Sequence, residues 1–271
     1  MEPHLTPNGD RPFAVITGAS SGIGFELAKV FARNGFDLLV AAEDSGIAEA
    51  AAQCRMEGAR IEPLQVDLAT YDGVEVLYRR ISSLGREVDT LVLNAGVGSG
   101  GAFVETDLGK DLNLLQLNVV GVVHLAKLVL RDMATRGRGR VLITSSIAAE
   151  APGPFNAVYS ASKAFDQSFA EGIRHEVKDK GITVTALQPG ATDTNFFSRA
   201  NMENTKVGQG EKDDPATVAQ DGFDALMAGR DHVIAGSFKN KIQGNLSKVL
   251  PERVAAAQHS KSNEPDNLPK H

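Results

Sequence analysis

The chain has 271 residues, which gives room for one large α/β domain or two small ones. Hydrophobic residues make up 42% and charged residues 23%, so the composition is that of a globular protein and excludes a disordered chain. Glycine is enriched, with 27 residues, about 10% against a background of roughly 7%. The net charge of −6 disfavours a nucleic-acid partner, because proteins that neutralise phosphates carry an excess of positive charge.

The two ends of the chain and its single cysteine indicate where the protein works. Residues 1–12 hold no basic region followed by an apolar run, and no stretch reaches 18 uninterrupted apolar residues, so we expect neither a secretory signal nor a membrane partner. Cys54 cannot form an internal disulfide, which fits a reducing compartment. We therefore expect a cytoplasmic protein. Residues 1–12 and 258–271 are polar and contain proline, and we expect both to be mobile around one domain at 13–257.

From residue 13 onward, short β-branched runs alternate with longer helical patterns. Strands are predicted at Phe13–Thr17, Phe36–Ala42, Ile61–Val66, Val88–Leu93, Arg140–Thr144 and Thr183–Leu187, with helices between them, the first two at Ile23–Asn34 and Ile47–Glu57. Such alternation requires right-handed crossovers between parallel strands. The sequence therefore predicts an α/β fold, a single doubly wound Rossmann-type domain with a central parallel sheet and helices on both faces.

A glycine-rich string follows the first predicted strand and reads Thr17-Gly18-Ala19-Ser20-Ser21-Gly22-Ile23-Gly24. Glycines here permit a tight turn and let the backbone approach a pyrophosphate, while the next helix offers free N–H groups to the anion. The spacing is G-x-x-x-G-x-G, not the usual dinucleotide fingerprint G-x-G-x-x-G. The string alone therefore leaves two interpretations open, a dinucleotide site or only a tight strand–helix turn.

A second cluster combines a tyrosine, a lysine and a serine. Tyr159 and Lys163 are four residues apart and lie on one helical face, so the ammonium group can favour the ionised phenol. A phenol with a pKa of about 10 is a poor acid or base at neutral pH without such help. Ser146 ends the strand VLITSS, where ligands collect in open α/β sheets. A serine there can equally be a turn residue that hydrogen-bonds the backbone.

Together these strings resemble the compact branch of the short-chain dehydrogenase/reductase family, from about Phe13 to Ala235. The motifs that match, in the family's order, are T-G-x-x-x-G-x-G at Thr17–Gly24, Asp67, N-A-G at Asn94–Gly96, Asn118, Ser146, Y-x-x-x-K at Tyr159 and Lys163, and Pro189-Gly190 with Thr194. The resemblance implies an NAD(P)-dependent oxidoreductase that interconverts a secondary alcohol and a ketone or aldehyde by hydride transfer.

The resemblance also implies a role for each matching residue. Tyr159 exchanges a proton with the substrate oxygen, and Ser146 orients that oxygen. Lys163 lowers the pKa of the tyrosine and holds the nicotinamide ribose, and Asn118 holds a water that links Lys163 to solvent. The residues implied to bind the cofactor, beside Tyr159 and Lys163, are Gly18, Ser20, Ser21, Gly22, Ile23, Gly24, Glu43, Asp67, Leu68, Asn94, Ala95, Gly96, Pro189, Gly190 and Thr194.

The choice between NAD and NADP depends on the end of the second predicted strand. Glu43 lies about 20 residues beyond the glycines, where a carboxylate can accept hydrogen bonds from the adenosine ribose and repel a 2′-phosphate. The family's NAD-selecting aspartate aligns with Ala42, so Glu43 can also point away from the ribose. No basic residue lies between Val40 and Gln53, and we therefore expect a weak preference for NAD(H) over NADP(H).

Two other interpretations and several further expectations remain. A non-catalytic redox-sensing regulator would bind the same dinucleotide without needing the four catalytic residues, and an epimerase or dehydratase of the extended branch would need a larger C-terminal domain. The resemblance places a mobile substrate lid at 191–214, and apolar Leu114–Leu130 favours a homodimer or homotetramer. No metal site is expected, because His124, His175 and Cys54 are scattered along the sequence.

The substrate pocket is expected to have apolar character. Phe155, Phe196, Phe197 and Met202 are expected to line the pocket of a small-molecule alcohol or carbonyl substrate.

Overall fold

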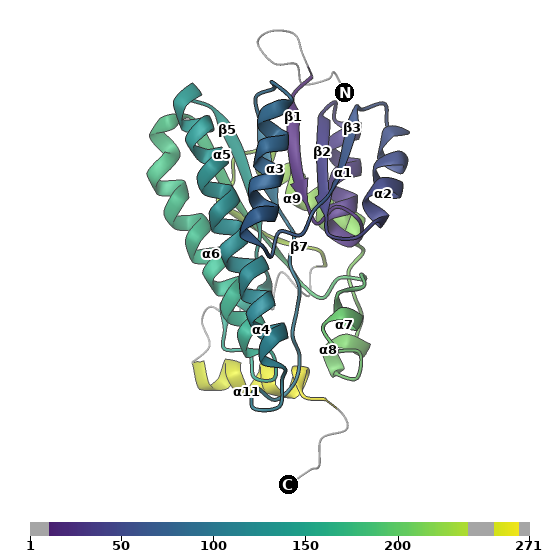
Figure 1. Cartoon of the computed structure of the whole chain (residues 1–271). Helices are drawn as coiled ribbons and strands as arrows, with labels where there is room; N and C mark the ends of the chain where they lie inside the picture. Colours follow the sequence, from purple (N-terminus) through teal and green to yellow (C-terminus); the bar gives the residue numbers. More distant parts are fainter. Residues whose placement is uncertain (1–10, 238–251, 266–271) are drawn as a thin grey trace.

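The computed structural model describes residues 11–237 and 252–265 (Figure 1). Its strands are β1 (Phe13–Thr17), β2 (Asp37–Ala42), β3 (Ile61–Gln65), β4 (Thr90–Leu93), β5 (Gly139–Thr144), β6 (Ile182–Pro189) and β7 (His232–Ala235). They form one parallel sheet in the order β3-β2-β1-β4-β5-β6-β7. The prediction of a single doubly wound parallel sheet is confirmed, and β7 is an edge strand that the sequence analysis did not predict.

Helices connect the strands and extend beyond the sheet. They are α1 (Gly22–Arg33), α2 (Gly46–Arg55), α3 (Tyr71–Ser83), α4 (Leu108–Leu115), α5 (Val122–Arg136), α6 (Ala157–Val177), α7 (Phe196–Arg199), α8 (Lys206–Gln209), α9 (Pro215–Met227) and α11 (Glu252–Asn263). A π-helix η1 (Gln116–Gly121) joins α4 to α5, and two short 3-10 helices are η2 (Ile147–Glu150) and η3 (Lys178–Lys180).

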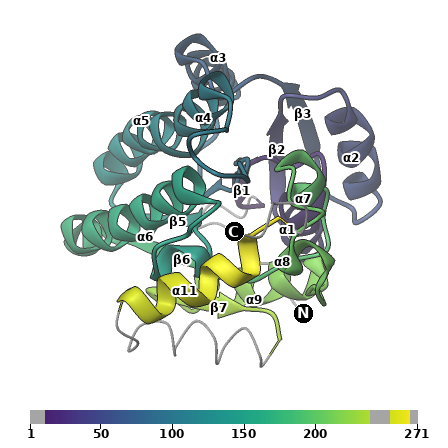
Figure 2. The ribbon, with the colours of Figure 1, turned by 90° about the horizontal axis from the view of Figure 1, so that it is seen from below.

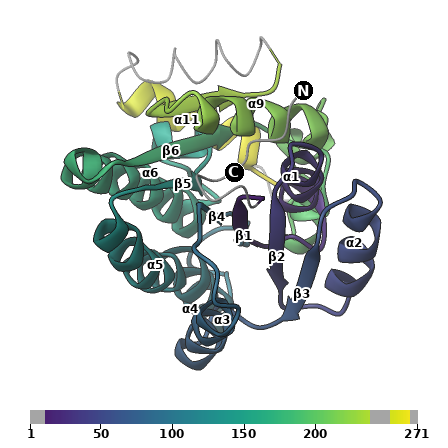
Figure 3. The same ribbon diagram turned by 90° about the horizontal axis from the view of Figure 1, so that it is seen from above.

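Two hydrophobic cores lie on opposite faces of the sheet, as expected for parallel strands buried on both sides. Side chains of β1 alternate between them: Ala14 and Ile16 pack with α1, α2 and α9, whereas Phe13 and Val15 pack with α3, α5 and α6. Figure 3 shows the two helical layers with the sheet between them. On the α1 side Phe31 meets the ring of Phe223 edge-on at 4.9 Å. Helices therefore pack on both faces of the sheet, and this packing fixes the positions of the strand ends.

The continuous helical run from Leu108 to Arg136 has 29 residues and a mean hydropathy of 1.5 in its most apolar window, which by length and composition is enough to cross a membrane. Core helices of water-exposed domains meet the same criterion. Leu125, Val129 and Met133 of α5 are buried against the sheet. The apolar character of this run is thus used, at least in part, to build the core.

The structure differs from the expectation at both ends of the domain. Residues 1–10 and 266–271 lie outside the described residues, but Arg11 is bound: it donates to the carbonyl oxygens of Gly35 (3.0 Å) and Gly58 (2.8 Å) and lies 3.3 Å from Asp37. Residues 258–263, expected to be a mobile tail, form the end of α11. Their polar composition does not prevent folding, because α11 packs beside α8 at the carboxyl ends of the strands (Figures 1 and 2).

Candidate active site

The glycine-rich string forms the turn between β1 and α1. Gly18 and Gly22 have φ values of +67° and +58°, in the left-handed region where a side chain is strained. A Cβ atom on Gly24 would lie 2.1 Å from the carbonyl oxygen of Gly18, so the helix approaches the strand as closely as it does only because no side chain intervenes. Ser21 precedes α1 without a side-chain cap bond, which leaves the first N–H groups of the helix for an anion. The turn fits the pyrophosphate of a dinucleotide.

The side chain of Asn94, which follows β4, forms hydrogen bonds with the ends of the two strands that flank β4. Its Nδ2 donates to the carbonyl oxygen of Thr17 at 3.1 Å, and its Oδ1 accepts from the Thr144 hydroxyl at 3.1 Å. Thr17 and Thr144 end β1 and β5, on either side of β4. The side chain of Asn94 therefore holds the floor of the site together, at the place where the strand order reverses and ligands bind in this class of fold.

Two carboxylates follow β2 and lie beside the glycine turn. Asp44 accepts from the Ser20 hydroxyl at 2.7 Å and from the Gly46 backbone at 3.0 Å, so it is fixed against the glycine turn. Glu43, the candidate from the sequence, is exposed. Both residues line the same cavity. The structure thus adds Asp44 as the carboxylate held beside the turn, a residue that spacing alone did not separate from its neighbour.

One cavity of about 270 Å³ runs from the glycine turn to Tyr159. Its lining includes every residue that the resemblance assigned to the cofactor: Gly18, Ser20, Ser21, Gly22, Ile23, Gly24, Glu43, Asp67, Leu68, Asn94, Ala95, Gly96, Tyr159, Lys163, Pro189, Gly190 and Thr194. Ser146 lines it as well. Asn118 does not line the cavity and lies behind it. Residues from six strand ends therefore meet around one hollow.

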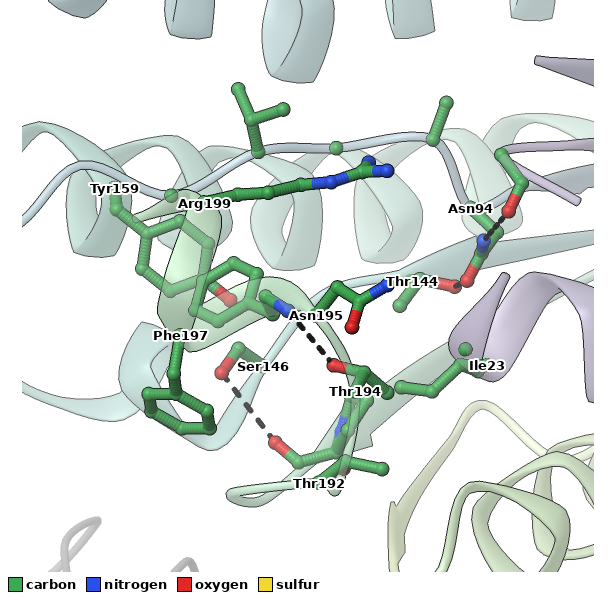
Figure 4. Close-up of a pocket in the computed structure, with 18 of the residues that line it drawn as sticks. Ile23, Asn94, Thr144, Ser146, Tyr159, Thr192, Thr194, Asn195, Phe197 and Arg199 are labelled. Carbon is green, nitrogen blue, oxygen red and sulfur yellow. Dashed lines mark hydrogen bonds between the residues drawn. The ribbon is translucent and has the colours of Figure 1, made fainter. Parts of the chain in front are cut away.

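Tyr159 and Ser146 meet at one end of this cavity (Figure 4). Burial raises the pKa of the Tyr159 phenol, while Lys163 and a hydrogen bond with Ser146 lower it, and the net pKa stays above the ordinary value. The sequence analysis expected Lys163 to lower this pKa; it does so, but burial outweighs it. Ser146 also accepts from the backbone N–H of Ala148 at 3.1 Å. With this pKa the phenol is protonated at neutral pH and can act as a proton donor.

Lys163 is held by two acceptors beneath the cavity. Its Nζ donates to the carbonyl oxygen of Thr144 at 2.9 Å and to Oδ2 of Asp166 at 3.0 Å. Burial lowers the pKa of Lys163, but the Asp166 carboxylate and Tyr159 together raise it by more, so the net pKa is above its ordinary value. The lysine is therefore an ammonium group with a fixed position.

Asn118 lies in the π-helix η1 and is fully buried. Its Nδ2 donates to the carbonyl oxygen of Val97 (3.0 Å) and to the Ser162 hydroxyl (3.1 Å), and its Oδ1 accepts from the backbone N–H of Val97 (3.0 Å). π-Helical turns inside longer helices are frequent at functional sites. Here the irregular turn brings Asn118 against α6, where it bonds Ser162, the residue before Lys163.

The segment after β6 and helix α11 also line the cavity. Phe196, Phe197 and Met202 lie in its lining, as expected, whereas Phe155, which has a left-handed φ of 58°, does not. The Phe196 ring lies 5.1 Å from that of Tyr159. Figure 4 shows the side chain of Arg199 extended from the Tyr159 end toward Asn94.

The sequence analysis missed several residues that line or adjoin the cavity. Asp166 could have been identified from the sequence, because it follows Lys163 by three residues and residues three apart on a helix are neighbours. Arg199 on α7 and His259 on α11 could not, since they reach the cavity only through tertiary packing. His259 is half-buried, and burial lowers its pKa. Asn263, which also lines the cavity, connects α11 to the loop before α6 by donating to the carbonyl oxygen of Pro154 at 3.2 Å.

Comparisons with known proteins agree with this architecture. A sequence profile of the short chain dehydrogenase family matches residues 12–205. Dehydrogenase/reductase SDR family member 7B of Rattus norvegicus is 30% identical over 269 residues, covering 93% of this chain and 83% of that protein. A short-chain dehydrogenase from Sphingobium yanoikuyae, solved in complex with NADPH, is 30% identical with a TM-score of 0.77, covering 82% of this chain and 87% of that one.

A second solved structure is the bulky-bulky ketone specific alcohol dehydrogenase from Comamonas testosteroni, which is 28% identical with a TM-score of 0.74 and covers 88% of this chain and 95% of that one. The family profile spans more than half of the chain, and the rat relative matches nearly all of it. The chain therefore belongs to the short-chain dehydrogenase/reductase family of NAD(P)-dependent oxidoreductases.

Proposed function

We propose that the protein interconverts a secondary alcohol and a ketone or aldehyde, with Ser146, Tyr159, Lys163 and Asn118 as its catalytic set. The observation that carries this proposal is that Ser146 and Tyr159 lie together in the same cavity as the glycine turn (Figure 4). A dinucleotide that starts at the turn and extends through the cavity reaches this pair. A redox sensor needs only the dinucleotide site, so the alternative of a non-catalytic regulator leaves the pair unexplained.

The bound nicotinamide supplies the hydride chemistry, and the residues of this chain supply position and the proton. Ser146 donates a hydrogen bond to the substrate oxygen and holds it beside the phenol. Tyr159 gives its proton to that oxygen during reduction and receives one during oxidation. Lys163 binds the ribose hydroxyls with its ammonium group. Asn118, fixed by Val97 and Ser162, holds the water through which the proton is replaced.

We propose a weak preference for NAD(H) over NADP(H). Asp44 supports it, because a carboxylate fixed beside the glycine turn can accept hydrogen bonds from the ribose and repels a 2′-phosphate. Glu43 adds a second negative charge at the same end of the cavity. Arg199 limits the preference, since a cation in this cavity attracts the phosphates of either cofactor. The Sphingobium relative was solved with NADPH, and the family accepts both cofactors.

A combined binding and turnover experiment tests the proposed function. Titration with NADH and NADPH gives the dissociation constants, and a panel of ketones, aldehydes and secondary alcohols is followed by cofactor absorbance. We expect turnover of at least one compound in the panel. In Tyr159→Phe the turnover rate should fall by a factor of about 10²–10⁴, while the affinity for the cofactor should stay nearly unchanged. Tight cofactor binding without turnover of any compound would favour the regulator instead.

We propose that residues 191–214 act as a lid that closes over cofactor and substrate. Thr194 supports this, because its Cγ2 lies against the position of a Cβ on Gly22, at 2.9 Å, so the segment contacts the glycine turn directly. Lids that exclude water from the site are common in such enzymes. Limited proteolysis tests it: saturating ligands should slow cleavage within 191–214, and equal rates would refute closure.

We also propose a cytoplasmic homodimer or homotetramer. Leu112 on α4, Val120 on η1 and Phe165 on α6 are exposed apolar residues, and neighbouring helices with such side chains can pair with a second copy. Cys54, which is buried and free, fits a reducing compartment. Light scattering at micromolar concentration tests the assembly, and a monomer would refute it.

A further inference from the structure

Asp166 is a carboxylate in the interior of α6 with no exposed surface. Its Oδ2 lies 3.0 Å from Nζ of Lys163, one turn earlier on the same helix, and Lys163 is itself 5% exposed. Burying two charges is costly, and an apolar pair of similar volume is often at least as stable. Ala170, the next residue on this face of α6, is such an apolar residue and packs in the core. Stability therefore does not explain a carboxylate at this position.

The ion pair fixes the direction of the lysine. An ammonium group has three N–H donors; one is taken by Asp166 and one by the carbonyl oxygen of Thr144 at 2.9 Å. Gly96 leaves the space beside Nζ open, since a Cβ there would lie 3.4 Å from it. Because Gly96 lines the cavity, the third N–H is left for the cavity, where the proposed function places the ribose hydroxyls.

The ion pair also changes the charge that Tyr159 experiences. A lone ammonium group four residues away favours the phenolate, and a carboxylate bound to that ammonium offsets part of its effect. Burial is the largest cause that raises the pKa of the Tyr159 phenol; Lys163 lowers this pKa, and Asp166 raises it. Asp166 therefore weakens the influence of Lys163 on the phenol.

We propose that Asp166 is a positioning residue for Lys163, which aims the ammonium group at the cavity and offsets part of the positive charge beside Tyr159. The inference rests on the proposed function, because it assumes that Tyr159 exchanges a proton with a substrate. The coupling between the charges of Asp166 and Lys163 can nevertheless be measured without a substrate.

Other titratable groups face this region from the elements packed on α6 or line the same cavity. Glu150 on η2 accepts from Gln188, and Asp111 on α4 accepts from Ser99 and Thr106. Arg199 on α7, within residues 191–214, and His259 on α11 also line the cavity. The charged groups that shift the pKa of the Tyr159 phenol are Lys163 and Asp166.

The test is a direct titration of Tyr159. The chain has three tyrosines and no tryptophan, so a Tyr71→Phe/Tyr78→Phe background leaves Tyr159 as the one source of the tyrosinate absorbance. In this background Asp166→Asn should lower the pKa of Tyr159 by about one pH unit, and Lys163→Met should raise it. An unchanged or higher pKa in Asp166→Asn would overturn the proposal, whether or not a substrate has been found.

A matched control and a stability measurement complete the test. Asp111 is also a buried carboxylate, but it pairs with hydroxyls, so Asp111→Asn should leave the titration of Tyr159 unchanged; an equal shift would show a nonspecific effect and overturn the proposal. If Asp166→Asn unfolds, thermal melting of Asp166→Leu, Lys163→Met and the double variant decides. The double variant should melt above either single variant, because each single variant leaves one buried charge unpaired. Additive effects would show that the two groups are not coupled.

Discussion

The preference for NAD(H) can be tested at one side chain. In Asp44→Asn the amide keeps the size of the residue and its bond to Ser20 but removes the negative charge. Between a carboxylate and a 2′-phosphate of about −2 charge at roughly 5 Å, Coulomb's law gives about 1.7 kcal/mol at a water-like dielectric. That energy corresponds to a factor of roughly 20 in affinity. We therefore expect the ratio of the NADPH and NADH dissociation constants to fall about 20-fold.

Fluorescence titration measures both constants, because the chain has no tryptophan and the emission of the reduced cofactor is read directly. Glu43→Gln is the matched control: it makes the same change of charge on the neighbouring residue, whose side chain is exposed. We expect this variant to change the ratio by less than Asp44→Asn does. If Glu43→Gln changes the ratio and Asp44→Asn leaves it unaltered, the assignment of Asp44 is refuted and Glu43 is the selecting residue.

Four further predictions follow from the geometry. Gly22→Ala places a Cβ 2.9 Å from Cγ2 of Thr194 in a left-handed conformation, which costs about 1–2 kcal/mol; cofactor affinity should fall about tenfold and recover in part with Thr194→Ser. Phe31→Ala should lower the free energy of unfolding in urea by about 3–5 kcal/mol, and a smaller loss would mean that the aromatic cluster collapses around the cavity. Burial raises the pKa of the Cys54 thiol to about 11, so a thiol reagent at mildly alkaline pH should react only after unfolding. Because the pKa of Tyr159 is raised, initial rates of reduction should hold through neutral pH and fall at alkaline pH, whereas oxidation rates should rise; the opposite trends would contradict the assigned proton donor.

Features encoded by contiguous residues could be predicted from the sequence. The glycine turn is determined within eight residues, since its left-handed positions and the close approach of α1 to β1 need glycine whatever surrounds them. The strand predictions succeeded for the same reason: an apolar run bounded by turns and helices is a local pattern. Crossover handedness restricts the topology without deciding the strand order, and the order that the structure has brings Ser146, Tyr159 and the turn to one edge of the sheet.

Boundaries and interruptions were less predictable. The apolar run Leu114–Leu130 is interrupted by the π-helix η1 at Asn118, because the side chain of Asn118 bonds to Val97 and Ser162 on neighbouring elements. Polar residues 258–263 were expected to be mobile, yet α11 folds against α8 and the loop at Pro154. A short amphipathic or polar segment folds when the rest of the domain offers it a surface, and composition does not report that surface.

What the sequence by itself determined is the parallel sheet, the glycine turn and the motif residues from which the resemblance to the family follows. What only the tertiary structure decided is their electrostatic state: that Asp44 is fixed beside the turn, that Arg199 reaches the cavity, and that Asp166 pairs with Lys163. The physical reason is that the two kinds of property depend on different neighbours, those along the chain and those in space. Backbone conformation is set by neighbours in the chain, whereas burial and the pairing of charges depend on which side chains packing brings within a few ångströms of one another.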